Sequence, residues 1–224
     1  MKKLPLPGET VLASDSGRFA GGKGLNQAVA IHRAGGDVTF QFAVGDDDDG
    51  EFLTNFLSEQ KVVFSKILDS GTATSKAFIL VDQDGENQIA VVPGANYSPK
   101  LREQSFQEGP GLLVLQLEIG NENNLVVAAL AKKAGWKVVL TPAPSSEFDP
   151  RLLEFVDIIT LNETEVTQLA GATDFESAGA ELSKLVGLVF VTRGAQGVSV
   201  FDDGQLMGNV EAMAVDAIDA TGAG

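Results

Sequence analysis

The sequence predicts an α/β fold built on a mostly parallel sheet, and three observations support this prediction. Short apolar runs bounded by Gly, Pro, Asn or Asp alternate with longer segments of helical periodicity. At 224 residues, the chain is long enough to bury a substantial core. Its 44 % apolar and 21 % charged residues are typical of a globular protein. We therefore expect one main folded unit in which crossover helices connect parallel strands.

Five apolar runs are predicted to be core strands. They are short, uninterrupted and flanked by turn-forming residues, as strands buried on both faces are. They cover residues 38–44, 112–117, 137–141, 158–161 and 188–192. Their spacing leaves room for one helix or more between most successive strands.

Helices are predicted between these strands, over residues 24–34, 50–60, 122–134, 163–170 and 177–185. In the first of them, Leu25, Ala28 and Val29 recur at three- and four-residue spacing together with His32. This face is expected to pack on the sheet. Because His32 is the one histidine of the chain, Ser/His/Asp catalysis has little support.

Two regions, within residues 9–20 and 72–93, do not follow the alternation and are expected to carry lid strands. In the second, apolar runs flank an Asp84-Gly85 step, which is a strong hairpin signal. We expect a small antiparallel flap outside the main sheet. Strands that a core cannot cover tend to be paired or hidden, so this flap is predicted to join two subunits as a homodimer.

The charge of the chain argues against two classes of partner. A formal net charge of −15 would repel a nucleic-acid backbone and an anionic lipid surface. No stretch approaches the roughly 20 apolar residues that span a bilayer, so the expected location is the cytoplasm.

The absence of cysteine excludes thiolate chemistry and disulfides. ATP is still a possible ligand, because magnesium and backbone N–H groups neutralise its phosphates.

Two local patterns come close to known motifs. Residues 17–24 read G-x-x-x-x-G-K-G, but a P-loop needs Ser or Thr where Gly24 stands, and a dinucleotide fingerprint needs a glycine at Gln27. This segment either lets a hydroxylated or anionic ligand approach the backbone or is simply a glycine-rich helix start with a solvated lysine. The acidic run 46–49 lacks EF-hand spacing and is better explained as a cap on the next helix.

The segment 219–224, D-A-T-G-A-G, offers small residues whose N–H groups could form an anion-binding nest. Taken alone, it could equally be a flexible glycine-rich tail. It is, however, the last of a co-linear series of motifs. The series is Pro7-Gly8-Glu9-Thr10, Gly21-Gly22-Lys23-Gly24-Leu25-Asn26-Gln27-Ala28, Gly45-Asp46-Asp47, Gly94-Ala95-Asn96, Gln116-Leu117-Glu118, Pro142-Ala143-Pro144, Asn162-Glu163-Thr164-Glu165, Thr192-Arg193-Gly194-Ala195-Gln196-Gly197 and Thr221-Gly222-Ala223-Gly224.

This order resembles, from end to end, the ribokinase pattern of the PfkB family of carbohydrate kinases. The resemblance implies a three-layer sandwich with a mostly parallel central sheet and a small β-flap, or lid. It implies ATP-dependent phosphorylation of a sugar hydroxyl, most closely D-ribose to ribose 5-phosphate. The implied cofactors are ATP and Mg²⁺, together with a monovalent cation such as K⁺.

The resemblance also assigns roles to individual residues. Substrate binding falls to Gly22, Lys23, Asn26 and Glu118, and nucleotide binding to Asn162, Thr192, Gly194 and Gly197. Glu165 is matched to the residue that organises Mg²⁺ indirectly, and Asp219 and Thr221 to the monovalent-cation site. The catalytic anion hole corresponds to Gly222, Ala223 and Gly224. Carboxylates and amides suit sugar hydroxyls, whereas N–H donors and magnesium suit phosphates.

Three departures from the family pattern shape the expected activity. Relatives begin with a strand carrying an Asn/Asp pair and place a catalytic Asp directly after the anion hole, so residues 1–224 are interpreted as one ribokinase-like domain that is incomplete at both ends. Thr141 replaces a common asparagine. The chain by itself is therefore expected to be inactive or very weakly active. The alternatives are a non-catalytic binding remnant or a piece of a fructose, ketodeoxygluconate or nucleoside kinase.

Overall fold

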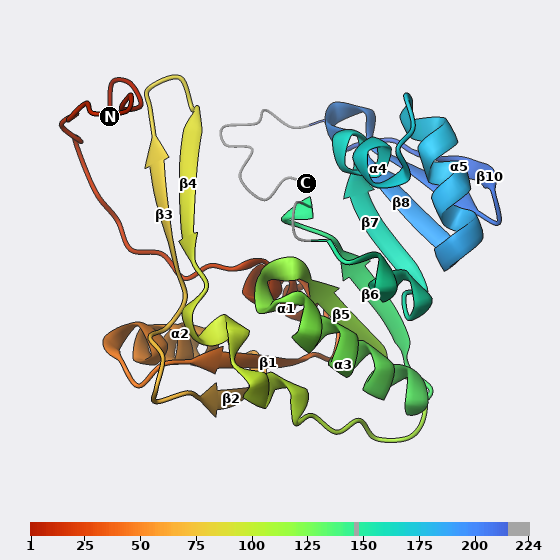
Figure 1. The fold of residues 1–224 in the computed structure, drawn as a ribbon, viewed down its shortest axis with the longest axis horizontal. Helices are drawn as coiled ribbons and strands as arrows, with labels where there is room; N and C mark the ends of the chain where they lie inside the picture. The colour runs from red at the N-terminus through yellow and green to blue at the C-terminus, as the bar shows by residue number, and fades with distance from the viewer. Residues whose placement is uncertain (146–147, 215–224) are drawn as a thin grey trace. The chain divides into compact units, whose positions relative to one another are not determined.

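The computed structural model describes residues 1–145 and 148–214 (Figure 1). The chain divides into two compact units, Met1–Leu101 and Arg102–Gly224. Each unit contains β-structure, helices and a hydrophobic core of its own. Within the described residues, no helix combines the length and the apolar character needed to cross a membrane.

The first unit contains two small sheets. Its elements are α1 (Lys23–Arg33), β1 (Thr39–Val44), α2 (Asp48–Glu59), β2 (Val63–Leu68), β3 (Lys76–Val81), β4 (Asn87–Val92) and the 3₁₀ turns η1 (Gly94–Tyr97) and η2 (Pro99–Arg102). Strands β1 and β2 are parallel, as expected for strands that a helix connects, and β3 and β4 are antiparallel. Strand β2 was not predicted, because Ser65 and Lys66 interrupt its apolar pattern.

The core of the first unit confirms the predicted apolar face of α1. Leu25, Ala28 and Val29 are buried in one cluster with Phe42. The Phe42 ring stacks on that of Phe40, with 5.2 Å between ring centroids. The three- and four-residue spacing thus marked the side of the helix that packs on a strand.

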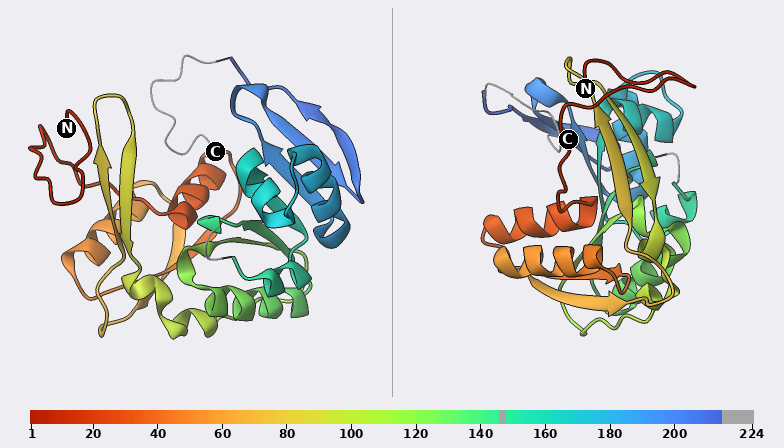
Figure 2. Two further views of the ribbon diagram at one scale, coloured as in Figure 1. Left: turned by 45° about the horizontal axis from the view of Figure 1, so that its top comes forward. Right: turned by 90° about the vertical axis from the view of Figure 1, so that its left-hand side faces the viewer.

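The hairpin β3–β4 is the flap that the Asp-Gly step predicted. Its turn is closed by Asp82, whose carboxylate accepts the N–H groups of Asp84 and Glu86 at 2.9 and 3.0 Å, and Gly85 takes a φ of +83°. Every residue of both strands is exposed, and the hairpin projects from β1 and β2 (Figure 2). The prediction of a further lid strand within residues 9–20 was wrong: this segment is irregular, and its Ser, Asp and Gly residues favour turns over strands.

A polar junction joins β1, α2 and the segment that enters β3. Asp47 caps α2, because its Oδ1 accepts the N–H of Gly50 at 2.9 Å. The same carboxylate accepts the Thr74 N–H at 2.8 Å and the Thr74 hydroxyl at 2.6 Å. These bonds, led by that of the Thr74 hydroxyl, lower the pKa of Asp47 to about 2. The acidic run is therefore a helix cap, as predicted.

The second unit is built on one six-stranded sheet. Its elements are β5 (Leu112–Gln116), η3 (Leu117–Ile119), α3 (Asn121–Lys133), β6 (Lys137–Thr141), η5 (Pro150–Glu154), β7 (Ile158–Asn162), α4 (Glu163–Ala170), α5 (Phe175–Val186), β8 (Leu188–Thr192), η6 (Gly194–Gln196), β9 (Val198–Asp202) and β10 (Gln205–Val210). The strand order is β10-β9-β8-β7-β6-β5. Strands β5 to β8 are parallel, and β9 is antiparallel to both of its neighbours, β8 and β10. Strands β9 and β10 were not predicted.

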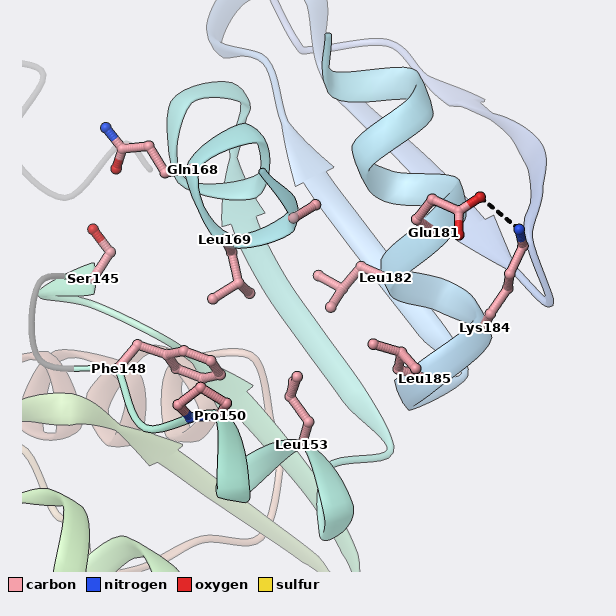
Figure 3. A pocket seen from close by; sticks show the side chains of 11 residues that line it. Ser145, Phe148, Pro150, Leu153, Gln168, Leu169, Glu181, Leu182, Lys184 and Leu185 are labelled. Carbon is pink, nitrogen blue, oxygen red and sulfur yellow. Dashed lines mark hydrogen bonds and ion pairs between the residues drawn. The ribbon is translucent and has the colours of Figure 1, made fainter. Parts of the chain in front are cut away.

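The helical side of this unit carries a surface groove between η5, α4 and α5 (Figure 3). The groove has a volume of about 650 Å³ and is lined mainly by apolar side chains, among them Leu153, Leu169 and Leu182. A Glu181–Lys184 ion pair of 2.6 Å lies at its rim. The groove lies against the C-terminal half of α4.

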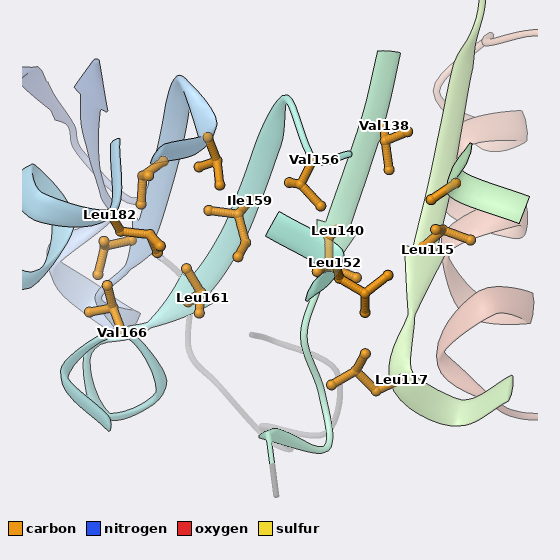
Figure 4. Packing of buried hydrophobic residues seen from close by; sticks show 14 of the residues in the cluster. Leu115, Leu117, Val138, Leu140, Leu152, Val156, Ile159, Leu161, Val166 and Leu182 are labelled. Atoms are coloured by element: carbon orange, nitrogen blue, oxygen red, sulfur yellow. The ribbon is translucent and has the colours of Figure 1, made fainter. Parts of the chain in front are cut away.

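The core of the second unit lies between the parallel strands and their helices (Figure 4). Alternate strand residues such as Leu140, Ile159 and Val189 are fully buried, and Val166 of α4 and Leu182 of α5 pack against them. The intervening strand positions are only half-buried. This burial fixes which residues of each strand face the helices.

We expect Asp47→Ala to lower the free energy of unfolding by about 2 kcal/mol, because it removes a helix cap and leaves the buried Thr74 hydroxyl without its acceptor. Urea denaturation followed by circular dichroism measures this. The pKa of Asp47 is lowered by folding, so its stabilisation is present above the ordinary value of 3.8 and is lost as pH falls toward about 2. The variant should lose less stability over that pH window.

The matched control is Asp46→Ala, which changes the exposed neighbouring carboxylate. This control should stay within about 0.5 kcal/mol of the unsubstituted chain. Equal stabilities of the two variants would contradict the assigned role of Asp47.

Candidate functional site

The four parallel strands of the second unit end at the same edge of the sheet. Gln116 of β5 is paired in register with Thr141 of β6, and Asn162 of β7 with Thr192 of β8. In open α/β sheets, ligands bind outside these carboxyl ends. The predicted nucleotide-binding residues Asn162 and Thr192 are therefore brought together where the fold favours binding.

Asn162 and Glu165 form a capping box at the start of α4. The Asn162 side chain accepts the Glu165 N–H at 2.8 Å, and Glu165 Oε2 accepts the Asn162 N–H at 2.9 Å. The local sequence N-E-T-E supplies both partners at the spacing that this motif needs. Helix capping is thus one role of this pair, and it holds both side chains beside the positive end of the helix.

The loop after β8 carries the predicted glycines Gly194 and Gly197. It is closed by the Arg193 N–H donating to Gly197 O at 2.8 Å and the Gly197 N–H donating to Gly194 O at 3.0 Å. Both glycines take a positive φ, +54° and +86°. Thr192 extends the strand into this loop and donates its hydroxyl to Leu161 O at 3.3 Å.

The two glycines differ in their surroundings. A Cβ on Gly197 would lie 1.9 Å from Val210 O, whereas a Cβ on Gly194 would meet nothing within 4 Å. The fold therefore requires Gly197 because the backbone at the end of β10 passes beside it. Packing gives no such reason for Gly194.

Glu118 lies in the η3 turn that follows β5 and is half-buried. Two buried asparagines of α3 hold the carbonyl groups on either side of it. Asn124 donates to Gln116 O and Asn123 donates to Ile119 O, both at 2.8 Å. Asn123 in turn accepts Arg102 Nε at 2.6 Å. The backbone that presents Glu118 is therefore fixed by side-chain amides.

The predicted sugar-binding residues Gly22, Lys23 and Asn26 lie together at the start of α1, in the first unit. Gly22 is the N-cap residue with a φ of +104°, and the helix has no side-chain cap and no acidic residue in its first turn. Its first-turn N–H groups and positive end are thus suited to a hydroxylated or anionic ligand. Lys23 and Asn26 are exposed.

The predicted monovalent-cation site and anion hole fall on residues that the structure does not describe. Asp219, Thr221, Gly222, Ala223 and Gly224 lie outside the described residues. Within the described part, no group of three or more His, Asp or Glu side chains is close enough to hold a metal ion. The groove of Figure 3 is lined by none of the predicted site residues.

The fold and the site together define an α/β protein in which polar side chains lie at the carboxyl ends of parallel strands. The chain belongs to the pfkB family of carbohydrate kinases, whose family profile matches residues 2–224. The family assignment made from the co-linear motifs is thereby confirmed, and with it the carbohydrate-kinase class.

Individual relatives agree with this assignment. The chain is 35% identical to the ribokinase of Lactococcus lactis subsp. lactis over 99% of its own length and 74% of that protein. The ribokinase structure from Thermotoga maritima matches with a TM-score of 0.83 at 30% identity, over 98% of this chain and 75% of that one. The Arabidopsis thaliana ribokinase complexed with ribose and ATP matches with a TM-score of 0.74 at 28% identity, over 98% and 74%. The predicted ribokinase-like α/β fold is confirmed.

Several residues around the site were not predicted from the sequence. Arg193 and Glu163 form an ion pair of 3.2 Å between the glycine loop and α4, and Asn123 and Asn124 support the Glu118 turn. The signal for Arg193 was its place inside the T-R-G motif. The asparagines gave a weaker signal, as two successive polar residues on a helix whose next turn is apolar.

We expect Gly197→Ala to destabilise the fold by more than about 2 kcal/mol, because its Cβ would overlap Val210 O and its φ of +86° is unfavourable for alanine. Gly194→Ala is the matched variant and should cost only about 1 kcal/mol, the strain of the left-handed conformation. Thermal unfolding of both variants measures the difference. Equal losses would show that the close approach at Gly197 is relieved by movement of β10.

Proposed function

We propose that this protein transfers a phosphoryl group from ATP to a hydroxyl of D-ribose, giving ribose 5-phosphate. The observation that carries this proposal is the similarity to ribokinases over nearly the whole chain, 99% for the Lactococcus protein. The related Arabidopsis ribokinase was solved as a complex with ribose and ATP. Family membership supports a carbohydrate kinase, and the choice of ribose is the finer step of the proposal.

The sugar contacts in this proposal are Gly22, Lys23, Asn26 and Glu118. A carboxylate accepts hydrogen bonds from sugar hydroxyls, an amide both donates and accepts, and a glycine lets the backbone approach closely. The asparagine-supported turn suits Glu118 to this role, because the direction of its backbone is fixed before a ligand binds.

The nucleotide contacts are Asn162, Thr192, Gly194 and Gly197. A glycine loop beside a helix N-terminus fits phosphates, because its N–H groups and the helix dipole favour negative charge. Magnesium usually takes one or two carboxylates plus phosphate oxygens, so Glu165, half-buried at the start of α4, fits an indirect role. Bound magnesium would neutralise charge on the transferred phosphoryl group.

The remaining assignments complete the proposal. Asp219 and Thr221 bind a monovalent cation such as potassium, and the N–H groups of Gly222, Ala223 and Gly224 form the anion hole for the transferred phosphoryl group. These roles rest on the motif D-A-T-G-A-G alone.

The test is calorimetry with D-ribose, D-fructose, ketodeoxygluconate and adenosine, together with an ADP-release assay in the presence and absence of Mg²⁺. D-Ribose should bind most tightly. Glu118→Ala should weaken its binding by about 1 to 3 kcal/mol, because a hydroxyl is left unpaired. The control Glu122→Ala changes an exposed carboxylate four residues away and should bind ribose normally.

Each outcome of these measurements decides a different part of the proposal. Tighter binding of another sugar would overturn the assignment to ribose. No binding of any sugar by the folded chain would overturn the kinase proposal. ADP release that depends on D-ribose would overturn the second candidate, a non-catalytic binding protein, and also the expectation that residues 1–224 are inactive by themselves. Sugar and nucleotide binding without ADP release agrees with both.

We also propose that the lid hairpin joins two copies of this chain. Ile79 pairs in register with Ile89, and both are more than half exposed. Phe78 lies on the opposite face of the ribbon and is 58 % exposed. A two-stranded ribbon with both faces apolar and exposed is only marginally stable in water. A second hairpin would cover the face that carries Ile79 and Ile89 and add strand pairing.

Light scattering at micromolar concentration should therefore give the mass of a dimer. Ile79→Lys should shift the protein toward monomer, because it places a charge in the covered face, whereas the control Gln88→Lys on the other face should not. A monomeric mass for the unsubstituted chain, with or without ribose, would refute the lid dimer.

A further inference from the structure

Arg193 links four elements of the second unit around the nucleotide-side loop. Its Nε donates to Glu163 Oε1 of α4 at 3.2 Å, and a terminal nitrogen donates to Gln196 Oε1 of η6. The other terminal nitrogen lies 3.5 Å from Ser199 Oγ of β9. Its guanidinium carbon lies 4.4 Å from the centroid of the Phe175 ring, at the start of α5.

These contacts use all three nitrogens of the guanidinium group and one face of its plane. A planar guanidinium with several donors in a fixed arrangement suits such a junction, which a lysine could not reproduce. The side chain is only 20 % exposed. Because the donors are directed at protein groups and the charge is paired with Glu163, direct phosphate binding is not the role that this geometry favours.

The place of Arg193 decides what the junction can do. Its backbone N–H closes the loop to Gly197, while its side chain reaches the first residue of α4, next to Asn162. The loop and the start of α4 are the two segments that carry the proposed nucleotide contacts. One residue therefore connects both segments, one through its backbone and the other through its side chain.

We propose that Arg193 is a positioning residue for the nucleotide: it holds the loop 194–197 at a fixed separation from the N-terminus of α4, so that the two segments contact the phosphates together. This inference rests on the proposed function. The Glu163 side chain is 47 % exposed, so this ion pair by itself adds little to global stability. The main effect of the residue is on nucleotide affinity.

The experiment measures binding of MgADP and of D-ribose separately by calorimetry, together with amide hydrogen exchange over residues 193–197. Arg193→Ala should weaken MgADP binding about tenfold, while D-ribose binding stays within about twofold. Amide exchange in the loop should rise, because its link to α4 is lost. Arg193→Lys keeps the charge but loses the fork, so its nucleotide affinity should be intermediate.

Arg151→Ala is the matched control. Arg151 is an exposed arginine of the same unit that pairs with Asp149 and Glu122. Its loss should leave both MgADP affinity and loop exchange unchanged. Glu163→Gln is a second test variant, because it removes the charge from the ion pair and leaves Arg193 in place. It should weaken MgADP binding less than Arg193→Ala does.

The outcomes separate this inference from the proposed function. Unchanged MgADP affinity and loop exchange in Arg193→Ala would overturn the positioning role while leaving the kinase proposal intact. An equal loss of MgADP and ribose affinity, with a large fall in Tm, would show a general structural role and also overturn it. Failure of the unsubstituted chain to bind MgADP would overturn the proposed function and this inference with it.

Discussion

The parallel register of β7 and β8 is the constraint on which the candidate nucleotide site depends. Ile159 and Val189 are paired in this register and fully buried against the helices. Because side chains alternate along a strand, a slip of one residue would turn these side chains out of the core, so burial fixes the register strongly. The same register places Asn162 beside Thr192 at the end of the strands. A hydrophobic requirement thus determines where two polar residues meet.

Several residues of the site have a structural role that can be separated from a chemical one. Gly197 is required by the passing backbone at Val210, and Asn162 caps α4. Gly194 has no comparable contact, so any strong effect of its substitution on function would reflect ligand approach and not packing. Glu165 both completes the cap and carries a charge, so replacement by glutamine separates the two, because glutamine also forms capping boxes.

In each unit, one charged side chain connects the end of a helix or strand to the elements beside it. In the first, the Asp47 carboxylate binds the start of α2 and the residue that leads into β3. In the second, the Arg193 guanidinium binds α4, η6 and β9 from one loop. Each is a charged side chain that makes several hydrogen bonds, and such charge-assisted bonds are stronger than bonds between neutral groups.

The sequence by itself determined the alternation of elements, the apolar face of α1, the capping role of the acidic run and the family. It gave β6, β8 and α4 their observed bounds, because uninterrupted apolar runs and a capping box are local signals. Only the tertiary structure decided the strand order, the unpredicted β2, β9 and β10, and pairs such as Asp47 with Thr74 or Arg193 with Glu163. The reason is physical: these partners lie about 30 residues apart in sequence, and their meeting is decided by which hydrophobic faces pack together, which no local spacing records.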